Sequence, residues 1–260
     1  MHETLEIVRD GTVATIWMNR PEVHNAFDER LIDELTRACL ELDGDPSVRV
    51  VVLAGRGRNF SAGADLNWMR RAAGNSVEEN RRDARRLAEM LRALAHMGKP
   101  TIARVQGAAL GGGTGLTAAC DMAVAARDAV FSTSEVRFGI IPSAISPYVL
   151  RAIGPRQALR YFQSAERIPA ERALAIGLVH EVAAGEELDR VVAALAADLM
   201  AGGPNALAAA KALVRDIAGR PIDASLGEET AERIARQRAT DEAREGISAF
   251  LEKRPPYWRP

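Results

Sequence analysis

The sequence contains few of the residues that build covalent or metal-bound frameworks. Its 260 residues include 2 cysteines and 4 histidines. Neither Cys39 nor Cys120 belongs to a CxxC pair, so we expect no disulfide framework and no structural zinc site. Both cysteines are predicted to be packing residues. The histidines show no H-E-x-x-H or other close ligand spacing, and no metal site is expected.

The chain also lacks an excess of charge of one sign and a long apolar run. Its 34 basic residues nearly cancel its 35 acidic ones, which argues against nucleic acid or an anionic membrane as a partner. The N-terminus does not show a charged segment followed by an apolar one, and no apolar run reaches membrane-spanning length. With 47% hydrophobic residues, we expect a globular, cytoplasmic protein with a full core.

Common nucleotide-binding and hydrolase motifs are missing as well. The glycine run 111–115 does not fit G-x-G-x-x-G, because Leu116 occupies the last required position, and no G-x-x-x-x-G-K-[ST] occurs. Ser61 lacks the leading glycine of a nucleophile elbow. Dinucleotide, P-loop and serine hydrolase functions are therefore disfavoured.

The elements that the sequence does indicate alternate between strands and helices. β-Branched runs at 12–18 and 49–53 predict strands, and apolar spacing predicts helices at 29–42 and 80–96. Further short strands are expected at 101–105, 121–126 and 129–132. This alternation predicts an α/β fold.

The composition changes near Gly202, where Gly202-Gly203-Pro204 interrupts the chain. Residues 206–252 are almost entirely helical in character, with a break at 219–221. We therefore expect a core at 1–201 and a helical region at 202–260 that docks on the core or on another subunit.

Two glycine-containing turns suggest a binding site. Four of the five residues at 111–115 are glycines. Ordering so many glycines costs backbone entropy, which indicates that a ligand or another part of the chain must approach the backbone closely here. A strand, a glycine turn and a helix in sequence would direct N–H groups and a positive dipole at an anion. A second turn at 59–66 has small residues at 61–64. If the turns converge, one N–H from each forms a pocket for an oxygen that becomes negative during reaction.

Several motifs together resemble one family. They are Met18-Asn19-Arg20-Pro21, Asn25-Ala26, Phe60 to Leu66, Gln106 to Gly113, Cys120-Asp121, Phe131 to Glu135, Gly139 to Pro142, Ala175 to Val179 and Glu245 to Phe250. Their order and spacing are similar to those of the crotonase superfamily, the enoyl-CoA hydratases and isomerases. The resemblance implies an α/β spiral of ββα units followed by a helical C-terminal trimerisation region, assembled as a homotrimer or a dimer of trimers.

The resemblance also implies an acyl-CoA substrate and a set of site residues. The N–H groups of Ala64 and Gly112 would hold the thioester oxygen as an enolate forms, and Glu135 would move protons, with burial raising its pKa. The residues that would contact the coenzyme part are Ala62, Ala64, Asp65, Leu66, Gly112, Phe250 and Lys253. No separate cofactor is expected, because coenzyme A is part of the substrate.

One expected residue is absent. Hydratases of this family carry a second glutamate at the position of Gly115. Addition of water ordinarily uses two carboxylates, whereas migration of a double bond can use one base. Considered alone, Gly115 favours an isomerase.

A narrower resemblance favours a hydratase. The segments 65–69, 111–116 and 134–148 resemble a bacterial subgroup assigned to methylglutaconyl-CoA and carboxygeranoyl-CoA hydration, which also has glycine at the position of Gly115. Such substrates carry a distal carboxylate, which Arg137 could bind if its segment is extended. Water could be oriented by Glu135 with help from the hydroxyls of Ser143, Ser146 or Thr114.

Three hypotheses follow from the sequence. The first is an enoyl-CoA hydratase acting on branched or carboxylated acyl chains. The second is a Δ3,Δ2-enoyl-CoA isomerase. The third is a catalytically reduced member that binds acyl-CoA or RNA.

Overall fold

The computed structural model describes residues 2–259 and divides into two compact units. The first unit comprises the residues up to Met97 and Thr101–Ala193, and the second comprises Gly98–Pro100 and the residues from Ala194 onward. The division falls inside α7 (Leu188–Ala201), whereas the sequence suggested a boundary after that helix.

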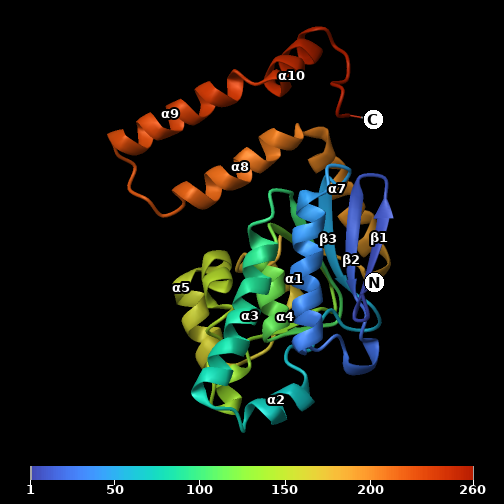
Figure 1. Cartoon of the computed structure of the whole chain (residues 1–260), viewed down its shortest axis with the longest axis vertical. Helices are drawn as coiled ribbons and strands as arrows, with labels where there is room; N and C mark the ends of the chain where they lie inside the picture. The colour runs from blue at the N-terminus through green and yellow to red at the C-terminus, as the bar shows by residue number, and fades with distance from the viewer. Residues whose placement is uncertain (1, 260) are drawn as a thin grey trace. The chain divides into compact units, whose positions relative to one another are not determined.

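A sheet of six strands forms the centre of the first unit (Figure 1). Its order is β1-β2-β3-β4-β6-β9. Only β1 and β2 pair in antiparallel fashion, and the other neighbours are parallel. The strands are β1 (Leu5–Asp10), β2 (Val13–Met18), β3 (Val50–Gly55), β4 (Thr101–Val105), β6 (Met122–Ala126) and β9 (Glu181–Ala183).

A second, three-stranded sheet contains β5 (Ala108–Leu110), β7 (Val130–Ser132) and β8 (Ile168–Pro169). The chain passes from β4 through β5 into a helix, and from β6 through β7 into another, so that each pass contributes one strand to each sheet. This repeated ββα arrangement confirms the predicted α/β class.

The first three helices begin where side chains satisfy their first N–H groups. Asp28 accepts a hydrogen bond from Leu31 N at the start of α1, and Ser76 and Glu79 form a capping box at the start of α3. The helices are α1 (Glu29–Gly44), α2 (Leu66–Ala72), α3 (Val77–Ala95), α4 (Gly112–Ala119), α5 (Ser146–Ser164), α6 (Ala170–Ala175) and the start of α7. Short 3-10 turns are η1 (Pro21–Val23), η2 (Glu135–Phe138) and η3 (Gly185–Glu187).

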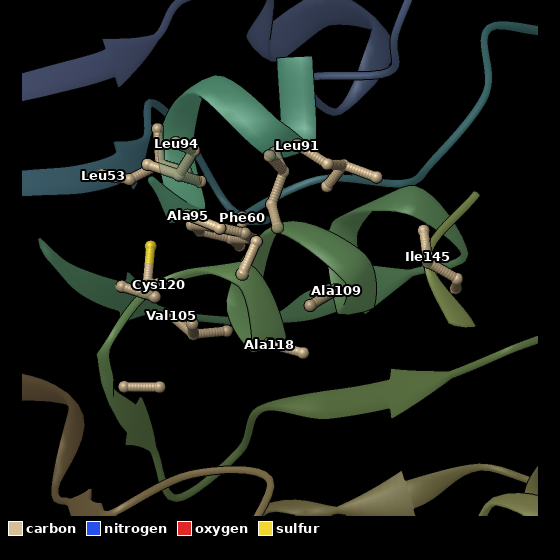
Figure 2. Packing of buried hydrophobic residues seen from close by; sticks show 14 of the residues in the cluster. Leu53, Phe60, Leu91, Leu94, Ala95, Val105, Ala109, Ala118, Cys120 and Ile145 are labelled. Carbon is tan, nitrogen blue, oxygen red and sulfur yellow. The ribbon is translucent and has the colours of Figure 1, made fainter. Parts of the chain in front are cut away.

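The core surrounds α4, in which every residue from Gly113 to Ala119 is buried. In Figure 2, Leu91 and Leu94 of α3 and Ile145 before α5 accompany α4 in this apolar cluster. Both cysteines are buried in the same cluster, as predicted. Because α4 is enclosed by neighbouring elements, its first turn is held at a fixed place in the unit.

The second unit is helical, as expected. It contains the end of α7 and the helices α8 (Pro204–Ile217), α9 (Ala224–Arg238) and α10 (Asp241–Leu251). The buried Glu242 accepts hydrogen bonds from the N–H groups of Asn205 and Ala206 and so joins α10 to the start of α8. Across residues 2–259, no single helix is long and apolar enough to cross a membrane, and the bent pair 185–201 and 204–217 reaches that length only when both helices are counted.

Candidate active site

The two glycine-containing turns lie against each other. Ser61 N donates to Ala108 O at 3.0 Å, and Leu110 N donates to Ser61 O at 2.9 Å, so the first turn continues beside β5. Gly63 has φ +86°, and a β-carbon there would lie 2.7 Å from Leu110 O and 3.7 Å from Gly112 N. Only glycine fits both this conformation and this contact.

The first turn leaves the N–H of Ala64 unbonded. On one side, Gly63 N donates to Ser61 Oγ at 3.2 Å. On the other, Asp65 N donates to Phe27 O at 2.8 Å. Ala64 N makes no hydrogen bond to any described residue, and its side chain is only partly buried. The turn therefore presents one donor to a ligand.

The second turn presents a similar donor. Gly111 has φ +50°, and its N–H donates to Ser132 O at 2.7 Å. Gly112 is the first residue of α4, so its N–H has no partner within the helix, and none outside it among residues 2–259. Its position is fixed by Phe27, since a β-carbon on Gly112 would lie 2.3 Å from Phe27 Cε2. Two unbonded N–H groups near the start of a buried helix can stabilise a developing oxyanion.

Glu135 lies beside Gly111, at the second turn. It is the first residue of η2, and a β-carbon built on Gly111 would be 3.4 Å from Glu135 Oε1. Glu135 Oε2 is buried and has no hydrogen-bond partner in the part of the chain that the structure describes. Burial raises the pKa of Glu135, because the charged form loses water, and a hydrogen bond from its own backbone only partly offsets this loss. A carboxyl group of this kind can exchange protons near neutral pH.

Gly115 faces Ile145. A β-carbon at Gly115 would lie 2.2 Å from Ile145 Cγ2 and 2.7 Å from Ile145 Cβ, and Ile145 is 2% exposed. The space in which a second glutamate would begin is therefore occupied by an aliphatic side chain.

Replacing Gly115 with alanine is expected to destabilise the protein by roughly 1–3 kcal/mol, because the added methyl overlaps Ile145. Combining it with Ile145→Ala should give a favourable coupling in a double-mutant cycle measured by urea unfolding. Gly227→Ala is the control, since a β-carbon there meets nothing within 4 Å. Wild-type stability of Gly115→Ala would contradict this packing.

The hydroxyl groups proposed to orient water differ in their availability. Thr114 Oγ1 lies 2.7 Å from Ala109 O and 3.0 Å from Ser132 O, either of which can accept its one proton, and the residue is fully buried. Ser146 Oγ donates to Ser143 O at 2.8 Å. The Thr114 hydroxyl thus connects the glycine turn to β7. The Ser143 hydroxyl is exposed, and it is the only one of the three that forms no hydrogen bond with another described residue.

The extended geometry expected for Arg137 does not occur. Residues 135–138 form a 3-10 helix, in which side chains two residues apart point in different directions. Arg137 is exposed, whereas Glu135 is partly buried. The condition under which both would point to the same side, an extended segment, is therefore not met, because the turn ending at Gly139, with φ +73°, winds the segment.

The residues expected to line the coenzyme path are distributed over both units. Ala62 and Ala64 are partly buried, and Leu66 is 77% exposed at the start of α2. Phe250, 81% exposed, and Lys253 belong to the second unit. Near the first turn, Ala62, Ala64 and Leu66 therefore all keep solvent-accessible surface.

Asp65, also expected on the coenzyme path, caps the helix α2. Its Oδ1 accepts hydrogen bonds from Asn67 N at 2.8 Å and Trp68 N at 3.2 Å, which caps α2, and its Oδ2 lies 3.2 Å from Arg20 Nη2. Burial acts to raise the pKa of Asp65, but these hydrogen bonds and the Arg20 charge outweigh it and lower the pKa. The carboxylate thus fixes the helix that follows the Ala64 donor.

Two residues that shape the site were not assigned roles from the sequence. Phe27 packs on Gly112 and pairs with the first turn, and Ile145 packs on Gly115. Phe27 directly follows the Asn25-Ala26 motif, which could have indicated it. No sequence pattern distinguishes Ile145 from any other core residue.

Known proteins share this architecture. A solved enoyl-CoA hydratase from Shewanella pealeana is 41% identical, with a TM-score of 0.96 and coverage of 98% of this chain and 96% of that one. The 2,3-dehydroadipyl-CoA hydratase of Escherichia coli is 34% identical over 256 residues, 98% of each chain. The crotonyl-CoA hydratase of Syntrophomonas wolfei is 33% identical, with coverage of 97% of this chain and 96% of that one.

These likenesses and the two-sheet ββα architecture define a protein of the crotonase class. More particularly, residues 9–260 match the enoyl-CoA hydratase/isomerase family model, and the chain belongs to that family. It is an enzyme of the enoyl-CoA hydratase type, as the motifs predicted.

Proposed function

We propose that this enzyme adds water to an enoyl-CoA whose acyl chain is branched or carboxylated. The thioester oxygen accepts hydrogen bonds from Ala64 N and Gly112 N, and Glu135 transfers the protons. The observation that carries this proposal is the buried, unpartnered carboxyl oxygen of Glu135 beside the Gly111 turn.

A single carboxylate can complete the reaction. Glu135 takes a proton from water as the water oxygen bonds to the β-carbon, and the electrons of the double bond move onto the thioester oxygen. The two N–H groups stabilise this enolate more than the neutral substrate, which lowers the barrier. Glu135 then returns its proton to the α-carbon as the carbonyl re-forms. Water and substrate atoms are all accounted for in the product.

The substrate class rests on similarity. One relative is named a 2,3-dehydroadipyl-CoA hydratase, and that name denotes an acyl chain with a second carboxyl group. A distal carboxylate requires a cationic partner. Arg137 is the candidate for this partner because it is exposed, although in η2 it does not point to the same side as Glu135 and could reach only the far end of a long acyl chain.

The second candidate is a Δ3,Δ2-enoyl-CoA isomerase. It is favoured by Gly115 and Ile145, because their packing leaves no second carboxylate at that position. Glu135 would remove a proton from the α-carbon and return it to the carbon two positions away, through a dienolate whose oxygen accepts from the same two N–H groups.

A panel of acyl-CoA thioesters with product masses separates these functions. Methylglutaconyl-CoA, 2,3-dehydroadipyl-CoA and crotonyl-CoA should gain the mass of one water and lose the absorbance of the conjugated thioester. Turnover of 3-enoyl-CoA alone, without a mass change, would replace hydration with isomerisation. Absence of turnover on the whole panel would favour a binding protein.

We also propose that the chain assembles as a homotrimer or a dimer of trimers through its second unit. Supporting this, Ile222, Phe250 and Leu251 of that unit are 97%, 81% and 72% exposed, and large apolar side chains at such exposure often mark interfaces. Light scattering after size-exclusion chromatography gives the mass of the assembly directly. A monomer at micromolar concentration would overturn the proposal.

A further inference from the structure

A basic hollow lies on α5 and α6, built from residues that the proposed reaction does not use. Its volume is 350 Å³, within the range of roughly 300–1,000 Å³ of small-molecule sites. It is lined by Arg156, Gln157, Leu159, Arg160 and Arg172. Three of these five residues are arginines and none is acidic.

Arg172 is held in position within this hollow. Its Nε donates to Tyr161 Oη at 2.9 Å, and one terminal nitrogen donates to Gln157 Oε1 at 3.0 Å. Tyr161 is only 2% exposed, so its ring is fixed by the core. A guanidinium group whose orientation is set in advance loses little entropy when it binds an anion.

The charges around the hollow do not cancel. Arg160 forms a forked pair with Glu166, with Nε–Oε1 at 2.5 Å and Nη2–Oε2 at 3.0 Å. Glu171 precedes Arg172 but is exposed and does not line the hollow. Arg156 has no ion-pair partner in the described part of the chain. Three cations and one paired carboxylate leave an excess of about two positive charges, counted with full ionisation.

We propose that this hollow binds a phosphate monoester. A phosphate monoester carries nearly two negative charges at neutral pH and three acceptor oxygens. Arginine forks match those oxygens with paired hydrogen bonds. Arg172, fixed by Tyr161 and Gln157, and the unpaired Arg156 are its principal ligands.

Isothermal titration with inorganic phosphate at low ionic strength tests the site. Wild-type enzyme should bind phosphate saturably, and Arg156→Gln should raise the Kd by about tenfold through loss of a charged hydrogen bond. Arg172→Lys keeps the charge but loses the fork, and should also weaken binding. Arg37→Gln on α1, an exposed arginine outside the hollow, should bind as the wild type does. Absence of saturable binding, or unchanged binding in both variants, would overturn the proposal.

The phosphate can come from the nucleotide of an acyl-CoA or from an unrelated phosphorylated compound. In the first case, Arg156→Gln raises KM for the acyl-CoA but not for the same acyl group on pantetheine. In the second case, both KM values stay as in the wild type while the phosphate Kd rises. Because binding is measured directly, failure of the site and failure of the proposed hydration are distinguishable.

Discussion

Replacing Glu135 with glutamine is expected to lower kcat on the preferred thioester by about 10²–10⁴-fold, with little change in KM. Glutamine keeps the size of the side chain beside Gly111 but cannot accept a proton from water. The two N–H groups proposed as oxyanion donors belong to the backbone and remain, so substrate binding should persist. Steady-state kinetics on the thioester panel provides the measurement.

The matched control is Glu22→Gln, which removes one carboxylate from an exposed position. It should retain wild-type kcat. A Glu135→Gln enzyme with unchanged kcat on every substrate would remove Glu135 from the mechanism and leave the oxyanion donors without a proton-transfer partner.

The raised pKa of Glu135 is expected to affect the pH dependence of both activity and stability. The base form is needed for attack, so kcat/KM should fall as pH drops through a value above that of an ordinary glutamate. For folding, both states are neutral at low pH, but between the unfolded pKa and the raised folded pKa the unfolded chain gives up its proton while the folded one keeps it. Wild type should therefore lose stability relative to Glu135→Gln as pH rises above the ordinary glutamate pKa, and the loss should level off above the raised folded pKa; paired thermal unfolding measures it.

The longer elements of the fold could be predicted because their patterns are local. The helix α1 and the strands β2 and β4 lie close to their expected ranges, since their apolar spacing fits one structure only. The strands β5 and β8 have 3 and 2 residues. Segments so short carry no periodic signal, and they are strands only because a distant part of the chain supplies the partner.

In the candidate site too, contacts between residues far apart in the sequence could not be predicted. The glycine run indicated close approach of the backbone, and the structure brings Gly63 and Gly112 together. Yet the sequence gives no sign that Ile145 fills the space beside Gly115, because this contact links residues on different elements. The extended segment considered for Arg137 does not form for a local reason, since the nearby Gly139 adopts a left-handed conformation and winds the segment into η2.

Replacing Gly112 with alanine is expected to lower kcat by about 10²–10³-fold, the range for loss of one oxyanion donor. The new methyl would overlap Phe27 Cε2, at 2.3 Å, and Cδ2, at 2.9 Å. Phe27 is 1% exposed, so its ring cannot turn aside into solvent. The backbone at Gly112 must then move, and its N–H no longer aligns with the Ala64 donor.

A second substitution distinguishes displacement of this donor from simple unfolding. Phe27→Leu removes the far edge of the ring, so Gly112→Ala combined with Phe27→Leu should regain part of both kcat and melting temperature relative to Gly112→Ala alone. Gly44→Ala is the control, because a β-carbon there meets nothing within 4 Å. If Gly112→Ala folds normally and keeps wild-type kcat, Gly112 N is not an oxyanion donor. Recovery of stability without recovery of kcat would instead mean that Phe27 itself sets the position of that N–H group.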